Sequence, residues 1–214
     1  MSRIIDSELE ELRALVYRMG DLAYQAVSMA IEESFRGGDL YHKIQGISDM
    51  LVILAEHVED KTFEIIARFQ PVASDLRAVK SYMKISYDFT RFGRYALDIS
   101  YLNKRFGGLK ESIKWIRAYT MKMGEKVLVM MKTSIEALKG KNIETARSIT
   151  EIEKEVDKLY FNFLDRIIEE KNVESRIIIS STLIVRYFER IADHAAYICE
   201  SLIYALTGRK ELFR

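Results

Sequence analysis

Two acidic residues near the C-terminus, Glu189 and Asp193, stand four positions apart in the amphipathic stretch RYFERIADHAAYICE. On a helix this spacing places both carboxylates on one face, where they repel each other by about 0.2–0.5 kcal/mol if exposed. A cation between them would remove this repulsion. The alternative is a solvated face on which Arg186 and Arg190 neutralise the acids, and the pair alone does not decide between the two interpretations.

A second acidic pair, Glu153 and Asp157, has the same spacing in the stretch EIEKEVDKLY. If the helices that contain the two pairs pack antiparallel, all four carboxylates can face one another. Such a set of oxygen ligands suits a hard or borderline cation, such as iron, manganese, zinc or magnesium. Carboxylate metal sites between facing helices are known in helical bundles. The pattern therefore predicts a metal site made of Glu153, Asp157, Glu189 and Asp193.

Histidine contributes little to this predicted site. No Glu is followed three positions later by His, so the Glu-x-x-His motif of the di-iron proteins is missing. His194 follows Asp193 directly and lies about 100° around the helix from it. The spacing predicts a histidine at the surface or beside the ligands, with a ligand at the flank of the site as the alternative.

Composition favours an all-α protein. The 214 residues are 49% apolar and 30% charged, with one proline and ten glycines, too few for the many turns of a sheet-rich fold. The net charge is +1 and like charges form no block, which argues against a nucleic-acid surface or a polybasic membrane anchor. The N-terminus has no apolar signal segment, and no window reaches about 18 apolar residues, so we expect a cytoplasmic protein without membrane spans. The single cysteine, Cys199, lies on an apolar face and is expected to be buried.

Clusters of Gly, Pro and Asn divide the chain into six predicted helices. Helices of this length joined by short turns must fold back on one another as antiparallel bundles. The predicted ranges are 7–36, 39–69, 74–106, 110–138, 142–170 and 174–206.

The chain also contains an internal repeat. A shift of 104 residues aligns Met19-Gly20 with Met123-Gly124, and beyond the Gln70-Pro71 turn a shift of 99 aligns Phe89 with Phe188. The change of offset falls between helices, where a deletion is tolerated. The repeat predicts two tandem, pseudo-symmetric three-helix bundles, at 1–105 and 106–214.

The first repeat does not reproduce the acidic set. The positions that correspond to the four acids are occupied by Asp49, Ile53, Thr90 and Arg94. We therefore expect the first repeat to have a degenerate motif without a metal. Arg94 either supplies the positive charge there, paired with Asp49 or Glu56, or points to solvent.

These patterns resemble the PhoU family of phosphate-uptake regulators over nearly the whole chain. The helix from Glu189 to Gly208 is similar to the ERIGDHA-containing helix of the family. QPVASDLR, Gln70 to Arg77, resembles the turn between the second and third family helices, and Met19-Gly20 and Gly38-Asp39 resemble the first helix and its end. The order of these motifs and the duplication strengthen the resemblance.

The resemblance implies a PhoU-like fold, in which each bundle can bind a multinuclear metal cluster through E/DxxxD pairs. This role transfers to Glu153, Asp157, Glu189 and Asp193 only, with iron as the first candidate metal and zinc, manganese or magnesium as others. The implied function is negative regulation of phosphate uptake and homeostasis, without enzymatic activity. The implied partners are the ATPase subunit of the phosphate ABC transporter and a sensor kinase, so that the chain would meet the membrane only through its partner. The sequence leaves open whether two copies form a homodimer.

Three other interpretations follow from the residues themselves. The same acids could meet basic side chains of a partner without any metal. A carboxylate-bridged metal enzyme, either a phosphoesterase or an oxidase, is the alternative from another class. The absence of a Gly-rich phosphate loop and of a nucleophile–histidine–acid set argues against that enzyme. The third interpretation is a helical scaffold that binds no metal.

Overall fold

The computed structural model of the chain describes residues 3–213, and within this range all regular secondary structure is helical. Five of the six predicted helices are present as single helices, with ends within a few residues of those expected. The helices are α1 (Ile4–Arg36), α2 (Tyr41–Phe69), α3 (Ala73–Phe106), α4 (Lys114–Gly140), α5 (Ile143–Arg147), α6 (Ile149–Ile168) and α7 (Ser175–Thr207).

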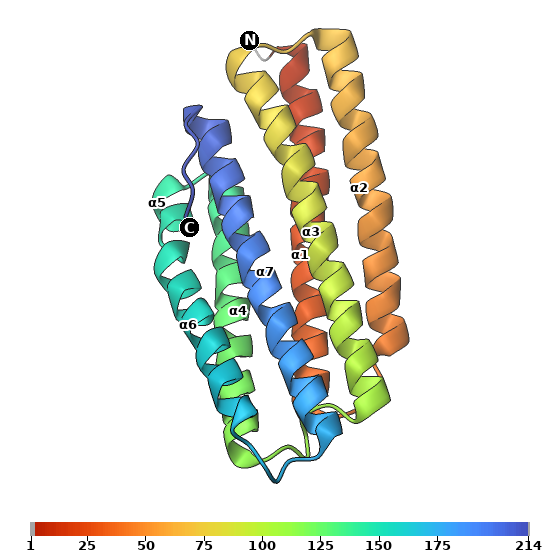
Figure 1. Cartoon of the computed structure of the whole chain (residues 1–214). Coiled ribbons are helices and arrows are strands. Elements are labelled where there is room, and N and C mark those ends of the chain that lie inside the picture. Colours follow the sequence, from red (N-terminus) through yellow and green to blue (C-terminus); the bar gives the residue numbers. More distant parts are fainter. Residues whose placement is uncertain (1–2, 214) are drawn as a thin grey trace.

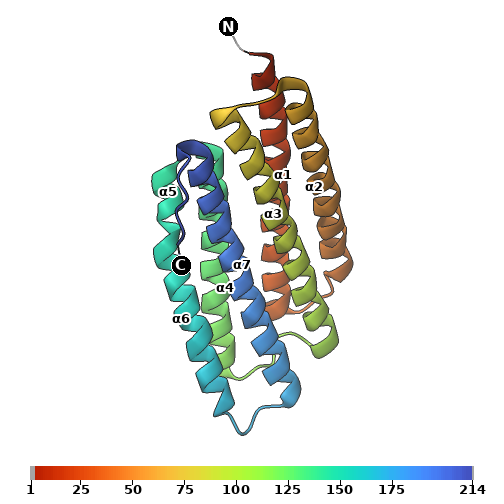
Figure 2. The same ribbon diagram turned by 45° about the horizontal axis from the view of Figure 1, so that its top comes forward.

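The helices form two antiparallel bundles that stand side by side (Figures 1 and 2). One bundle contains α1, α2 and α3, and the other contains α4, α7 and the α5–α6 pair. The bundles meet where α3 packs on α7 and where α1 packs on α4. Beyond α7 the chain turns back along its own bundle, so that the C-terminal segment lies beside α7 (Figure 1).

The sequence predicted most helix ends correctly, because glycine and proline at those ends disfavour a continued helix. Gly37, Gly107 and Gly208 have positive φ values of 78°, 84° and 74°, a conformation that glycine adopts without a steric penalty. Pro71 lies two residues after Phe69, the last residue of α2, and it cannot donate the N–H that a continued helix needs. The predicted cap Asn142 accepts a hydrogen bond from the backbone N–H of Thr145 at 3.1 Å.

The predicted fifth helix is wrong in one respect, because the chain bends at Ser148 and forms α5 and α6 instead of one helix. The Ser148 hydroxyl donates to the carbonyl of Thr145 at 2.9 Å, and the Thr150 hydroxyl donates to that of Arg147 at 3.0 Å. Serine and threonine that bond to the carbonyl of the preceding turn compete with helix hydrogen bonds and bend helices. These bonds favour the break but are not sufficient for it, because Ser86 and Thr90 bond back in the same way within the continuous helix α3.

In both repeats a phenylalanine ring packs against a glycine of a neighbouring helix. The ring of Phe89 lies over Gly20, where an added Cβ would come within 3.0 Å of Cζ, and the ring of Phe188 lies over Gly124 at 3.4 Å. Both phenylalanines are fully buried. These glycines and phenylalanines are the residues that the internal repeat aligns, so the equivalence predicted from sequence is present in the packing. The limits of the repeats, 1–105 and 106–214, stay a prediction.

Of the helices in residues 3–213, none has a stretch that is both long and apolar enough to cross a bilayer.

Cys199 is fully buried on α7, as the sequence predicted. Burial raises the pKa of its thiol well above the ordinary value, and the nearby carboxylates Glu200 and Glu153 raise it further. Because the thiolate is the reactive form, we expect no labelling of the native protein by a disulfide reagent at pH 8. The chain unfolded in urea should be labelled completely in the same time. Labelling of the native protein at the unfolded rate would contradict the buried position.

Candidate functional site

The four predicted acidic ligands lie on two helices that pack against each other, Glu153 and Asp157 on α6 and Glu189 and Asp193 on α7. None of them is fully solvated. Glu153 and Asp193 are each only 3% exposed, and Asp157 and Glu189 are half-buried. The carboxylates therefore lie on two neighbouring helices in buried or half-buried positions rather than on a solvated face. That all four meet at one metal site stays a prediction.

Charge is concentrated around Glu189. Burial raises the pKa of this carboxyl above its ordinary value, and the negative charge of Asp193 raises it further, with a smaller contribution from Asp157. Glu153 lies four residues before Asp157 on α6, where its charge acts on the Cys199 thiol. The structure thus groups Asp157, Glu189 and Asp193 electrostatically and places Glu153 toward the next turn of α7.

Two arginines of α7 occupy the positions from which a cation would neutralise these acids. Arg186 Nη1 lies 2.7 Å from Glu189 Oε2, and Arg190 Nη1 lies 3.2 Å from Asp193 Oδ2. Each pair is three residues apart, a spacing at which helical side chains meet. The sequence offered, as an alternative to a metal, a solvated face on which Arg186 and Arg190 neutralise the acids. The arginines do pair with the acids, but the face is not solvated.

The carboxylates suit a hard cation in kind but are not arranged around one. Within residues 3–213, no three His, Cys, Asp or Glu side chains are positioned to hold a metal ion. The described arrangement is the ion-paired one, in which Arg186 and Arg190 supply the positive charge. Binding of a metal by these residues stays a prediction, and it requires the arginines to give up their partners.

His194 lies elsewhere than predicted. It is buried, 5% exposed, and points from α7 toward the first repeat rather than to the surface. Its Nδ1 is 2.8 Å from Asp88 Oδ1, and its Nε2 is 3.3 Å from the Tyr95 hydroxyl, both on α3. The histidine therefore joins the two repeats.

Sequence reasoning missed Asp88 as the partner of His194. A signal was available, because Asp88 is three residues after Ile85 and four before Phe92, both of which are buried core residues of α3. An acid in that register must be buried and needs a hydrogen-bond partner. Burial raises the pKa of its carboxyl, and the contact with His194 opposes that shift.

Asp88→Ala should lower the free energy of unfolding by about 2 kcal/mol, because it leaves a buried imidazole nitrogen without its partner. Asp88→Asn retains an acceptor oxygen at the same place and should cost distinctly less. Urea unfolding of the two variants beside the wild type measures the difference. Equal losses for both variants would mean that the hydrogen bond to His194 contributes nothing.

The first repeat lacks an equivalent acidic set, as the sequence indicated. Ile53 and Arg94 are exposed, and the Thr90 hydroxyl donates to the carbonyl of Ser86 at 2.9 Å. Within the described chain no ion pair joins Arg94 to Asp49 or Glu56. Its charge acts instead on Asp98, where it lowers a carboxyl pKa that burial raises.

The comparison with known families follows this duplication. A family model described as the PhoU domain matches residues 16–102 and again residues 120–202. The chain belongs to the PhoU family. The two matches fall on the two bundles, so each bundle is one PhoU repeat and the predicted fold class is confirmed.

PhoU relatives match the chain over nearly its full length. The PhoU homologue of Clostridium acetobutylicum, named a phosphate-specific transport system accessory protein, is 32% identical over 97% of this chain and 96% of its own. A Thermotoga maritima homologue of the same description is 27% identical over 98% of this chain and 92% of its own. The names of these relatives describe accessory proteins rather than enzymes.

Solved PhoU structures share the fold. The crystal structure of PhoU from Pseudomonas aeruginosa superposes with a TM-score of 0.87 at 25% identity, covering 95% of this chain and 99% of that one. The PhoU regulatory protein of Streptococcus pneumoniae superposes with a TM-score of 0.74, also at 25% identity, over 97% and 99% of the chains. The two-bundle arrangement is therefore that of PhoU.

Proposed function

We propose that this protein is a cytoplasmic, non-enzymatic regulator that lowers phosphate uptake by binding the ATPase subunit of a phosphate ABC transporter. The observation that supports this proposal is the full-length match to accessory proteins of the phosphate-specific transport system, with both repeats present. Because the chain belongs to the PhoU family, we propose a sensor kinase as a second partner.

The alternative of a carboxylate-bridged metal enzyme has no support in these relatives, because their names give accessory roles. It also requires a metal held with an open coordination position. In residues 3–213 two of the four carboxylates that would provide the ligands, Glu189 and Asp193, are paired with arginines of their own helix.

A metal ion or cluster at Glu153, Asp157, Glu189 and Asp193 forms the second part of the proposal. The support is the chemistry of the set: four carboxylates on two neighbouring helices, where burial and like charge raise the pKa of Glu189. A bound cation would remove that unfavourable charge density. It would also stiffen the α6–α7 surface that the regulator presents.

Binding to the purified ATPase subunit tests the proposed partner. We expect saturable binding by the full chain, measured by biolayer interferometry, and none to the ATPase subunit of an unrelated importer. In a host that lacks its own PhoU protein, expression of the chain should lower the uptake of labelled phosphate. Absence of both effects with a correctly folded protein would refute the proposal.

A further inference from the structure

A cavity of about 260 Å³ opens where α3, the end of α7 and the C-terminal segment meet. It lies at the boundary between the two repeats, and none of the four predicted metal ligands lines it. Its lining includes the α3 residues Lys80, Ser81 and Lys84, the α7 residue Ser201, and Lys210 of the C-terminal segment. The same cavity is thus built from both repeats.

Positive charge around this cavity is not balanced. Within residues 3–213, none of its three lysines forms an ion pair. Of its two acids, Glu211 is held by Arg147, with Oε1 and Oε2 at 2.6 and 3.0 Å from the guanidinium, and Glu200 accepts the backbone N–H of Phe213 at 3.0 Å. Arg147 therefore neutralises Glu211, whereas Glu200 keeps its negative charge. Three lysines against this one acid leave a net positive charge at the cavity.

Tyrosines of α7 help to hold two of these lysines in place. The Lys80 ammonium lies 5.3 Å from the centre of the Tyr204 ring, and that of Lys84 lies 5.8 Å from the centre of the Tyr197 ring. These are distances at which a cation is attracted to an aromatic face. Both ammonium groups of α3 are thereby directed toward α7.

Two buried hydroxyls complete the lining. Ser81 is 3% and Ser201 is 5% exposed, and within the described residues neither Oγ has a hydrogen-bond partner. Buried polar groups are normally satisfied. In the described chain Ser28, Thr62 and Ser100 are also unpartnered but line neither this cavity nor its neighbour, so the missing partner matters here because it coincides with the lysines. Ser180, the repeat equivalent of Ser81, is also buried and unpartnered, but it lines neither this cavity nor its neighbour.

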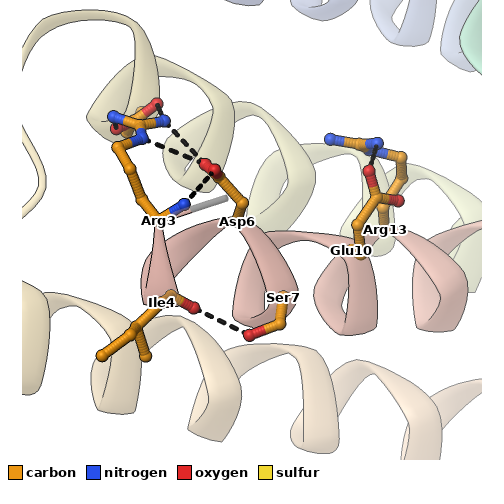
Figure 3. A network of polar contacts seen from close by, with 7 residues as sticks. Arg3, Ile4, Asp6, Ser7, Glu10 and Arg13 are labelled. Carbon is orange, nitrogen blue, oxygen red and sulfur yellow. Dashed lines mark hydrogen bonds and ion pairs between the residues drawn. The ribbon is translucent and has the colours of Figure 1, made fainter. Parts of the chain in front are cut away.

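The neighbouring cavity, of about 330 Å³, shares Ser81 but differs in charge. Its rim carries a network of ion pairs: Arg3 bridges Asp6 and Asp75 at 2.8 and 2.9 Å, and Arg13 pairs with Glu10. Figure 3 shows the Arg3–Asp6 and Arg13–Glu10 pairs. Each of these charges already has a partner. Lys141 also lines this cavity and forms no ion pair within residues 3–213, so the lysine-lined cavity differs from it in having three such lysines and two unpartnered hydroxyls instead of one of each.

We propose that the lysine-lined cavity binds a small tetrahedral oxyanion, namely inorganic phosphate or the phosphate group of a small ester. The hydroxyls of Ser81 and Ser201 would donate to its oxygens, and Lys80, Lys84 and Lys210 would neutralise its charge. Hydrogen bonds to a charged acceptor are about twice as strong as neutral ones, which suits a dianion. Because the ligand would contact α3, α7 and the C-terminal segment together, its binding would stabilise the packing of the two repeats.

Calorimetric titration of the full chain with orthophosphate tests the proposal, at an ionic strength fixed with chloride to screen non-specific attraction. We expect one saturable site. Lys80→Gln/Lys84→Gln and Ser201→Ala should each weaken binding about tenfold or more, since each removes a donor to a charged group. Ser180→Ala is the matched control and should bind as the wild type does.

Thermal unfolding separates a lost ligand site from a lost fold. Each variant should be folded without phosphate, and only the wild type and Ser180→Ala should gain stability when phosphate is added. Glycerol phosphate in place of orthophosphate identifies the source of the group, because tighter binding of the ester would assign the site to an esterified ligand. No saturation by either compound, or equal binding by Ser201→Ala and Ser180→Ala, would overturn the proposal. The test uses no transporter, so its failure is distinct from failure of the proposed regulatory function.

Discussion

Phe188→Ala should lower the free energy of unfolding by about 3–5 kcal/mol, as expected for a large aromatic side chain removed from a close-packed core. The ring is fully buried and lies over Gly124 at van der Waals distance. Gly124 has no side chain with which to fill the space that the ring vacates. Phe89→Ala, in which the ring over Gly20 is removed, should cost a similar amount.

Urea unfolding followed by circular dichroism measures both losses. Phe161→Ala is a suitable control, because Phe161 on α6 is 61% exposed and its replacement should change stability by less than about 0.5 kcal/mol. A loss at Phe188 no larger than at Phe161 would mean that the glycine–aromatic contact is not part of the core. A large loss at only one of Phe89 and Phe188 would mean that the two repeats are not equivalent in packing.

Much of this fold could be predicted from local patterns in the sequence. The apolar periodicity identified the long helices, and the residues at Gly37, Pro71, Gly107 and Gly208 identified their ends, because each disfavours a continued helix. The internal repeat identified which residues should be equivalent. The repeat alone does not say which helices pack against each other.

The break at Ser148 escaped prediction because serine and threonine that bond back to the preceding turn do not always end a helix, as Ser86 and Thr90 within α3 show. Serine and threonine hydroxyls can point to solvent in a continuous helix or bond back to the preceding turn. Here both Ser148 and Thr150 bond back, and Arg147 beside them is tied to Glu211 of the C-terminal segment. The last contact spans 64 residues and leaves no trace in the local sequence.

The acidic site was predictable only in part, because some of its contacts lie within one helix and others depend on the tertiary structure. The spacing of four between Glu189 and Asp193, and of three from Arg186 and Arg190 to these acids, is readable from one helix. Whether the arginines or a metal ion pairs with the acids depends on the relative free energies of the two states, which spacing does not contain. The partner of His194 could not be read from its own helix either, because Asp88 lies 106 residues away.

If the arginines and a metal ion compete for the acids, removing the arginines should raise the affinity for the metal and removing an acid should lower it. Arg186→Gln/Arg190→Gln should raise the affinity for Mn²⁺ or Zn²⁺ about tenfold or more, because it removes two positive charges that a divalent cation must displace. Glu189→Gln should lower the affinity by a similar factor, because it removes a negatively charged ligand. Elemental analysis after equilibrium dialysis, with calorimetric titration of each variant, measures both changes.

Glu155→Gln is the matched control for this experiment. Glu155 lies on α6 between Glu153 and Asp157, but it is exposed and pairs with Lys126, so its replacement should leave the affinity unchanged. Binding should also weaken as the pH falls, because protonation of Glu189, whose pKa is raised, competes with the metal. If neither the wild type nor the arginine variant retains an ion, the metal proposal fails. The acids would then serve to pair with the arginines of α7, or with basic side chains of a partner that displaces them.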